Sequence, residues 1–309
     1  MGRLANLRMV DPVLTELARG YSNAEMIAEH LFPLVGNLAK EAGKIPQWSK
    51  EAFKLYNTER AIRAMSNRVN PEGTTPIVFA LSEYDLEYPI DYREEDESMF
   101  GLEQVGVEFT MGWIQLQREK QSADLAQNPD NYATGSKLAL SGSDQFTDPT
   151  SDPCGVIDDA KESIRQKIGR RPNTLEIGAT TFKALKKHPQ LIEKIKYSQK
   201  GIITLDLMKE IFDIDKLIVG EAVYADDAGT FHDIWGDSMT LAWVPGASAT
   251  APRSKRSPSY GYTLRKKGMP ETDTRMENGG KLKVVRSTDN YDVLLVGAEA
   301  GFLVSNTNL

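Results

Sequence analysis

The clearest periodicity in the chain is a two-residue alternation near residue 90, in which apolar side chains alternate with mostly acidic ones. The apolar positions are Tyr84, Leu86, Tyr88, Ile90 and Tyr92. A period of two predicts a β-strand with one apolar face. A basic segment at 53–69 and turn-forming residues at 70–73 precede this strand, so we expect a long hairpin over 46–92. Because isolated hairpins are marginally stable in water, the hairpin is expected to contact another subunit.

Apolar side chains then recur at steps of three and four between residues 95 and 127. They are Leu102, Val105, Phe109, Trp113 and Leu116. This spacing predicts one long helix, and some thirty residues at about 1.5 Å each would make a rod of about 45 Å. We expect Trp113 to pack this helix against a sheet.

Residues 150–245 alternate between helical and strand patterns. Asp152 and Pro153 predict a helix start, because an aspartate can cap the helix and proline suits the first turn. The expected apolar strands lie at 173–179, 216–224 and 239–244. This order predicts a compact α/β unit. Residues 1–45 instead indicate an arm with two short helices that must pack on another surface.

Composition narrows the classes of function. The chain has 309 residues, 40% of them hydrophobic, so it can bury a sizeable core. Its net charge of -7 argues against a dedicated nucleic-acid binder, which needs a basic excess. The single cysteine, Cys154, excludes an intrachain disulfide and suits a reducing compartment. Neither a membrane-spanning apolar stretch nor a signal-peptide core is present in the sequence, so we expect no membrane partner.

Candidate chemistry is sparse. The three histidines, His30, His188 and His232, have no metal-binding spacing. His232 could approach Asp233 and Asp237, but a solvated loop is the favoured interpretation. The segment 226–229 is interpreted as a plain turn because it lacks the alternating acids of a calcium loop. A phosphate loop and a nucleophile elbow are absent from the sequence. We therefore predict no catalytic, cofactor-binding or metal-binding residue.

Several local sequences resemble those of tailed-phage major capsid proteins with the Hong Kong 97 fold. They are Arg171 to Ala179 (RPNTLEIGA), Phe182, Leu185, His188-Pro189, Ile195-Lys196-Tyr197, Glu221 to Tyr224 (EAVY), Ile234 to Asp237 (IWGD) and Glu87 to Asp91 (EYPID). The order of arm, hairpin, long helix, α/β unit and late strands is also similar over nearly the whole chain.

The resemblance implies an α+β fold with the divisions of that family. The implied parts are an N-arm (1–45), an extended E-loop hairpin (46–93), a peripheral domain with a spine helix (94–149), an axial domain (150–245), a peripheral return (246–288) and a final axial strand (289–309). It also implies a structural subunit, not an enzyme, that assembles through hexamers and pentamers into an icosahedral shell around double-stranded DNA.

The same resemblance implies partners and contacts. The expected partners are other copies of the chain, a separate scaffold protein, a portal protein at one vertex, an optional decoration protein and DNA bound only non-specifically. A separate scaffold is favoured because the arm begins almost at Met1. The expected location is the virion capsid, assembled in the host cytoplasm. The candidate intersubunit contacts are Phe53, Tyr56, Arg60, Arg63, Arg68, Tyr84, Tyr88 and Tyr92.

Two other functions remain open at this point. One is an encapsulin-like bacterial compartment, which shares the fold but loads protein cargo; the arm at 1–45 disfavours it. The other is a soluble α/β enzyme with a pocket in the region 173–244. The long hairpin disfavours the enzyme, because a monomeric enzyme has no use for so large a projection.

Overall fold

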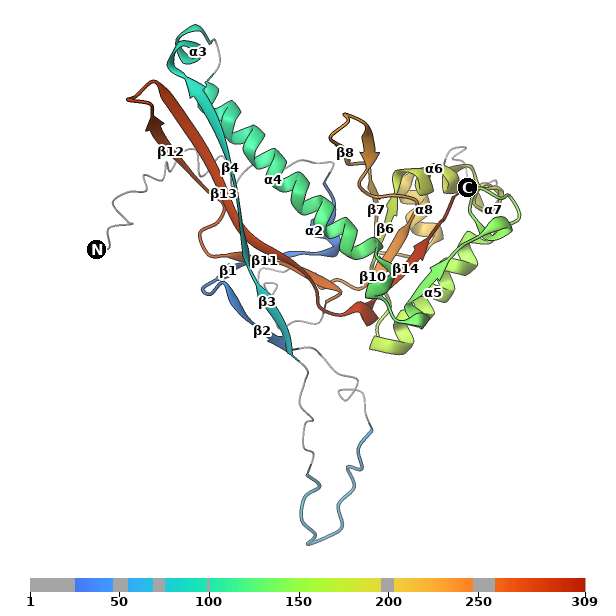
Figure 1. The fold of residues 1–309 in the computed structure, drawn as a ribbon. Coiled ribbons are helices and arrows are strands. Elements are labelled where there is room, and N and C mark those ends of the chain that lie inside the picture. Colours follow the sequence, from blue (N-terminus) through green and yellow to red (C-terminus); the bar gives the residue numbers. More distant parts are fainter. Residues whose placement is uncertain are drawn as a thin grey trace.

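The computed structural model describes residues 26–46, 55–68, 76–98, 101–195, 203–246 and 259–308. Figure 1 shows two parts side by side: an elongated part with long strands and a long helix, and a rounder part that holds the C-terminus. We call them the peripheral part and the axial part.

The peripheral part is built around the long strand β13 (Leu282–Leu295). This strand pairs antiparallel with β4 (Ser82–Asp91) on one edge and with β12 (Glu271–Glu277) on the other, while its last residues pair with β11 (Gly261–Lys266). The strand β1 (Leu34–Leu38) runs parallel to β11. The alternating strand found in the sequence, β4, is therefore a member of the main sheet.

The helix α4 (Leu102–Gln127) packs across β4 and β13. Its 26 residues span about 39 Å at 1.5 Å per residue. The single helix predicted from residue 95 is wrong at its start. Asp91 caps a separate helix, α3 (Tyr92–Glu97), through the N–H of Arg93, and Ser98 then adopts an extended conformation that ends it.

The inward face of α4 also differs from the predicted one. Phe109 and Trp113 are each 51% exposed, so the expectation that Trp113 packs against a sheet is wrong. The buried residues of the helix are Gly106, Val107, Thr110, Met111, Ile114, Gln115, Arg118, Glu119, Ser122, Ala123 and Ala126. Five of these eleven residues are polar, so hydropathy spacing centred the predicted face on Phe109 and Trp113, although Leu102 and Leu116 do pack against the core.

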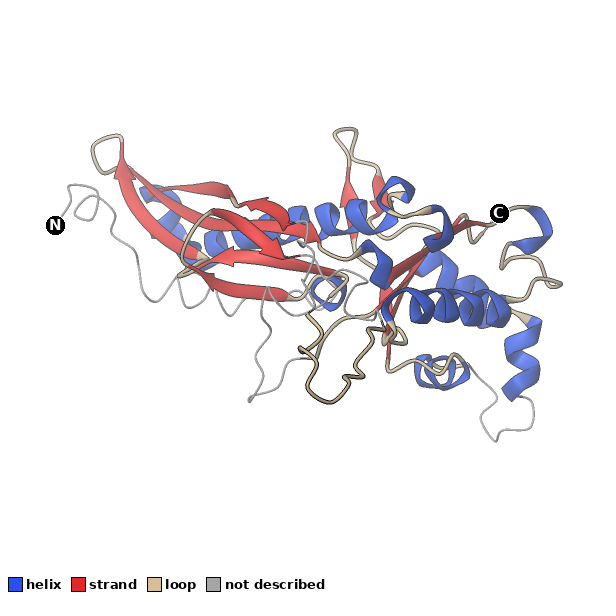
Figure 2. Cartoon of the chain, turned by 90° about the horizontal axis from the view of Figure 1, so that it is seen from below, coloured by secondary structure: helices blue, strands red, loops and turns tan. Residues whose placement is uncertain are grey.

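The axial part contains a mixed sheet with the order β5-β14-β10-β6-β7 among the described residues. The strands are β5 (Lys137–Ala139), β14 (Gly301–Ser305), β10 (Met239–Ala242), β6 (Thr174–Gly178) and β7 (Lys216–Gly220). The helices are α5 (Pro153–Ile168), α6 (Ala179–Lys187), α7 (Pro189–Ile195) and α8 (Leu205–Ile211). Figure 2 shows these helices gathered at one end of the molecule and the long strands at the other. The compact α/β unit predicted for the middle of the chain is present.

The start of α5 follows the sequence prediction. The side chain of Asp152 accepts a hydrogen bond from the N–H of Gly155 at 2.9 Å, and Pro153 occupies the first helical position. The helix ends at Gly169, whose left-handed φ of 67° suits glycine.

The predicted hairpin over 46–92 forms with a different second strand. The strand β2 (Ala42–Pro46) pairs antiparallel with β3 (Pro76–Ala80), and β4 follows only after this pair has ended. Figure 1 shows residues 55–68, which lie between β2 and β3 in the sequence, away from both parts. The projection is thus shorter than expected, because its last ten residues lie in the peripheral sheet.

Two further boundaries differ from those implied by the resemblance. The boundary at residue 289 falls inside β13, and β5 belongs to the axial sheet although it was assigned to the peripheral domain. The remaining short elements are α2 (Ala28–Leu31), β8 (Val223–Ala225), β9 (Phe231–Asp233), η2 (Pro129–Asn131), η3 (Thr134–Ser136), η4 (Gly142–Asp144) and η5 (Ala298–Ala300).

Candidate assembly surface

A buried serine–histidine pair in the axial part resembles part of a nucleophilic site. The Oγ of Ser151 lies 3.1 Å from Nε2 of His188, which also lies 3.2 Å from the carbonyl oxygen of Asp148. The other ring nitrogen, Nδ1, accepts the N–H of Gln190 at 3.3 Å. The proton of the neutral ring is therefore on Nε2, facing Ser151, so the ring cannot accept the serine proton. The pair connects the start of α7 to the loop before α5.

The loop around His232 holds a turn. The Oδ1 of Asp226 accepts the N–H groups of Ala228 and Thr230, and its Oδ2 lies 3.0 Å from Nε2 of His232. These bonds close the β8–β9 hairpin. Within the described part of the chain, no three His, Cys, Asp or Glu side chains gather to hold a metal ion.

A buried acid lies on β6, an inner strand of the axial sheet. Glu176 is fully buried, and desolvation raises the pKa of its carboxyl well above the ordinary value. Nearby, the hydroxyls of Tyr132 and Tyr260 are hydrogen-bonded to each other, and burial raises the pKa of both groups. Since all three side chains are enclosed, this cluster is inaccessible to a substrate and contributes to the packing between the two parts.

Among the described residues, the most exposed apolar side chains lie on residues 55–68, which we call the projecting loop. Leu55 is 98% exposed, Ile62 94% and Met65 79%. All fourteen described residues of the loop are exposed, including Arg60, Arg63, Arg68 and Tyr56. Large apolar groups held away from any core are a feature of interaction sites. Of the candidate contacts, Phe53 lies outside the described residues.

The loop has some internal order. The side-chain nitrogen of Asn67 donates to the carbonyl oxygens of Asn57 and Glu59, at 2.7 and 3.0 Å, and thereby joins the two limbs. The guanidinium of Arg60 donates to the carbonyl oxygen of Ala64. These bonds hold the limbs together while the apolar side chains point into solvent.

Two predicted contact residues have partners within their own subunit. Tyr84 stacks on Tyr291 with ring centroids 4.4 Å apart, and its hydroxyl accepts a hydrogen bond from Gln121. Tyr88 stacks on Phe109 at 6.2 Å. Within one subunit these tyrosines attach β4 to α4 and β13, and their contact with a neighbouring subunit stays a prediction. Tyr92 is 42% exposed at the start of α3.

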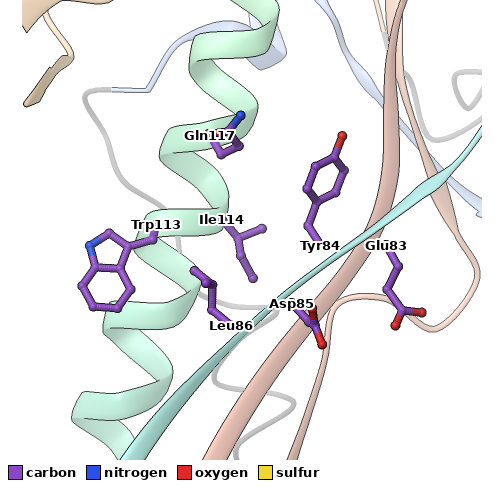
Figure 3. A pocket seen from close by; sticks show the side chains of 7 residues that line it. All are labelled: Glu83, Tyr84, Asp85, Leu86, Trp113, Ile114 and Gln117. Carbon is purple, nitrogen blue, oxygen red and sulfur yellow. The ribbon is translucent and has the colours of Figure 1, made fainter. Parts of the chain in front are cut away.

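A second exposed apolar surface lies where β4 meets α4. It consists of Leu86, Phe109 and Trp113, which are 38%, 51% and 51% exposed, and we call it the aromatic ledge. Phe109 and Trp113 stack at 5.8 Å. A hollow of about 390 Å³ adjoins Trp113 and is also lined by Glu83, Tyr84, Asp85, Leu86, Ile114 and Gln117 (Figure 3).

The strand beside the ledge and the projecting loop carry opposite charges. Glu83 and Asp85 line the hollow from β4, and Figure 3 shows their carboxylates on the side of the strand away from the helix. The loop contains three arginines and one glutamate. The sequence missed the ledge because it assigned Phe109 and Trp113 to the buried face of α4.

The comparisons with known proteins identify the family of the chain. A sequence model of the family described as phage major capsid protein E matches residues 120–274. The chain is also 59% identical over 308 residues to the major capsid protein of Burkholderia phage BcepMu, covering 100% of both chains. The chain belongs to the phage major capsid protein E family.

Solved structures show the fold. A phage-related protein from Bordetella bronchiseptica is 32% identical, with a TM-score of 0.82 over 98% of both chains. An encapsulin complex from Synechococcus elongatus is 12% identical, with a TM-score of 0.51, and covers 97% of this chain and 96% of that one. The capsid protein has the Hong Kong 97 fold, as the sequence resemblance implied.

Family membership decides between the functions that the sequence left open. The chain is a structural protein of the virion capsid and associates with copies of itself. The encapsulin is a distant relative in fold alone, so the compartment alternative is not favoured. Among the described helices, none has both the length and the apolar character needed to cross a membrane.

Proposed function

We propose that this capsid protein assembles through hexamers and pentamers into an icosahedral shell that encloses a double-stranded DNA genome, and that the projecting loop of one subunit holds its neighbour. The observation that carries the proposal is the exposure of Leu55, Ile62 and Met65 on a loop that extends from the body of the subunit. Burial of such side chains is worth about 1.5 to 3 kcal/mol each, which a neighbouring copy can supply.

The aromatic ledge is the surface that fits this loop. Its apolar side chains match those of the loop, and the carboxylates of Glu83 and Asp85, on the other side of β4, carry charges opposite to those of Arg60 and Arg63. Figure 1 shows the loop directed away from α4, so a subunit's loop is placed to meet the ledge of another copy. A contact between two different surfaces is head-to-tail, and such contacts form rings where the rotation between neighbours closes.

Charge reversal tests this pairing. One variant carries Arg60→Glu and Arg63→Glu, and a second carries Glu83→Lys and Asp85→Lys. Each alone places like charges opposite each other, so we expect loss of assembly by electron microscopy and sedimentation. A chain with all four changes should assemble again.

Mixing the two variants gives a sharper test. Each loop then finds an oppositely charged ledge only on the other variant, so the two must alternate around a ring. Alternation closes a ring of six but not a ring of five, and we expect hexamers without closed shells. Normal assembly of either variant alone would contradict the pairing.

The remaining partners rest on the family resemblance. We propose a separate scaffold protein during assembly in the host cytoplasm, a portal protein at one vertex, a decoration protein on some shells, and non-specific contact with packaged DNA. The net charge of -7 suits weak, non-specific DNA contact. Expression of the chain alone and with lysate from its native source, followed by electron microscopy of the particles, tests whether a scaffold is required.

A further inference from the structure

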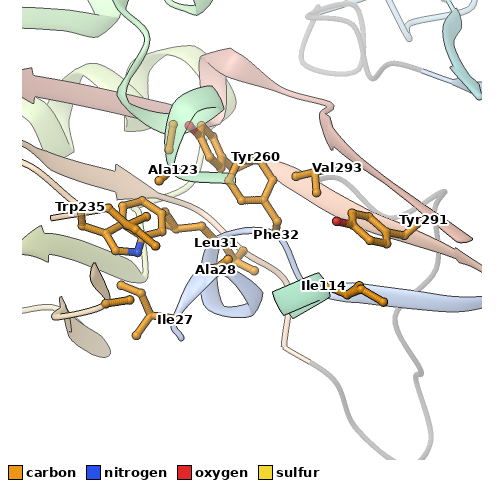
Figure 4. Packing of buried hydrophobic residues seen from close by; sticks show 14 of the residues in the cluster. Ile27, Ala28, Leu31, Phe32, Ile114, Ala123, Trp235, Tyr260, Tyr291 and Val293 are labelled. Carbon is orange, nitrogen blue, oxygen red and sulfur yellow. The ribbon is translucent and has the colours of Figure 1, made fainter. Parts of the chain in front are cut away.

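The segment from Ile27 to Pro33, which includes α2, lies at the junction of the peripheral and axial parts. Ile27, Ala28, Leu31 and Phe32 are all buried there. Figure 4 shows them between Trp235 of the axial part and Tyr260, Tyr291 and Val293 of the peripheral part. We call residues 27–33 the wedge.

Glu119 of α4 holds the wedge by its backbone. The Oε1 of Glu119 accepts the N–H of Ile27 at 2.9 Å, and Oε2 accepts that of Ala28 at 3.0 Å. The same Oε1 accepts the indole N–H of Trp235 at 2.7 Å. Glu119 is only 2% exposed. A carboxylate so buried is tolerated because these donors satisfy its oxygens, and the bonds therefore join the helix, the wedge and the axial part at one point.

Further polar contacts tie the wedge to both parts. Glu29 pairs with Arg118 of α4 at 2.8 Å. Nζ of Lys216, at the start of the axial strand β7, lies 2.7 Å from Nδ1 of His30. On the peripheral side, the hydroxyl of Thr263 donates to the carbonyl oxygen of Phe32 at 2.9 Å.

Packing around the wedge leaves little room for adjustment. A Cβ on Gly261 of β11 would collide with the ring of Phe32, and a Cβ on Gly220 of β7 would collide with the ring of Trp235. In the peripheral part the ring of Phe32 thus lies against Gly261, and in the axial part the ring of Trp235 lies against Gly220. A shift of the wedge therefore changes how the two sheets sit against each other.

We propose that the wedge sets the angle between the peripheral and axial parts and thereby the curvature of the shell, with Glu119 as its positioning residue. The inference rests on the proposed shell function, because one chain that forms both hexamers and pentamers must hold a defined angle in each. Control of curvature, which the shell function alone does not assign, is thereby placed on residues 27–33 and on Glu119.

The test uses Glu119→Gln, which keeps the size of the side chain but places an NH₂ group where one oxygen now accepts an N–H. Ile164→Val is the matched control, since it trims a fully buried side chain of the axial core that belongs to a different buried cluster from the wedge. Trp235→Phe, which removes the indole N–H donor together with part of a fully buried ring, is a second variant. The unfolding midpoints of Trp235→Phe and Glu119→Gln are compared with that of Ile164→Val.

Two measurements follow. By hydrogen exchange on unassembled subunits, the amides of Ile27 and Ala28 should exchange at least about tenfold faster in Glu119→Gln, since each loses a charge-assisted bond. By electron microscopy, shells of Glu119→Gln and Trp235→Phe should have a broader distribution of diameters than the wild type or Ile164→Val.

The outcomes separate the two proposals. Unchanged exchange at Ile27 and Ala28, or equal broadening of diameters in Ile164→Val, would overturn the role of the wedge while leaving the shell function intact. If the wild-type chain forms no rings or shells under any condition, the shell function fails, and curvature control fails with it. The exchange result then still reports whether Glu119 anchors the wedge.

Discussion

The central strands of the axial part and the projecting loop are opposite extremes of burial. Every residue of β6 and β10 is buried, whereas every described residue of the loop is exposed. Both regions contain large apolar side chains, so composition does not distinguish them. The difference is in what covers these side chains. Those of the strands are covered by their own chain, and those of the loop require another copy.

This contrast separates two kinds of stability. Substitutions in β6 or β10 act on folding of the single subunit, because the lost contacts lie inside it. Substitutions on the loop leave that folding unchanged and act on association. The following predictions are ordered by their expected effect on the free energy of unfolding of the subunit.

The largest effect is expected at Leu241 in the middle of β10. This side chain is fully buried, and its residue is paired with Leu175 on β6 and Phe302 on β14. Leu241→Ala should lower the free energy of unfolding by about 2 to 5 kcal/mol, because truncation leaves a cavity that the sheet cannot close. Urea unfolding of the subunit measures this. A loss below about 1 kcal/mol would mean that the axial core repacks easily and would weaken the comparison.

A smaller change, an increase in the free energy of unfolding, is expected when Glu176 is replaced. Desolvation raises the pKa of its carboxyl in the folded state above the ordinary 4.5, so the folded chain holds this proton more tightly than the unfolded chain. Its contribution to stability is therefore greatest at low pH and is lost as pH rises from 4.5 through the folded-state pKa.

The substitution Glu176→Gln removes this titration. At pH 8 it should raise the free energy of unfolding by on the order of 1 kcal/mol or more, since tenfold tighter proton binding corresponds to about 1.4 kcal/mol. The gain should shrink toward pH 4, and unfolding curves at both pH values measure it. Glu87→Gln is a control of opposite sign, because its bond to Arg275 lowers the pKa of Glu87. A gain that is equal at both pH values would show that Glu176 is not the titrating group.

The sequence predicted the axial part more successfully than the peripheral surfaces. Apolar runs and the cap at Asp152 located its helices and strands, because burial of a strand on both faces leaves a continuous apolar run. The buried face of α4 escaped prediction because it includes Arg118 and Glu119, whose burial depends on partners distant in sequence, Glu29 and Trp235. Hydropathy spacing instead selected Phe109 and Trp113, which face solvent in the single subunit.

The pairing of β4 was missed for a related reason. Alternation shows that a segment forms a strand with one apolar face, but it does not identify the neighbouring strand. Tyr84 and Tyr88 would show the same pattern in a projecting hairpin or in the main sheet. The basic segment 53–69, which precedes the strand across a turn, was therefore assumed as the partner, whereas β13 lies about two hundred residues later.

The smallest effect on the isolated subunit is expected at Ile62 on the projecting loop. With 94% of this side chain already exposed, Ile62→Ser should change the free energy of unfolding by less than about 0.5 kcal/mol. Assembly should nevertheless weaken, because each proposed contact with a neighbour loses one buried apolar side chain. Burial of such a side chain contributes about 1.5 to 3 kcal/mol to the free energy of association. Sedimentation of shells across a concentration series measures the shift. Met276→Ser, which alters a 61% exposed side chain on β12, is the matched control. Equal weakening by both would show that general surface hydrophobicity drives association, and the distinction between the loop and the rest of the surface would then be lost.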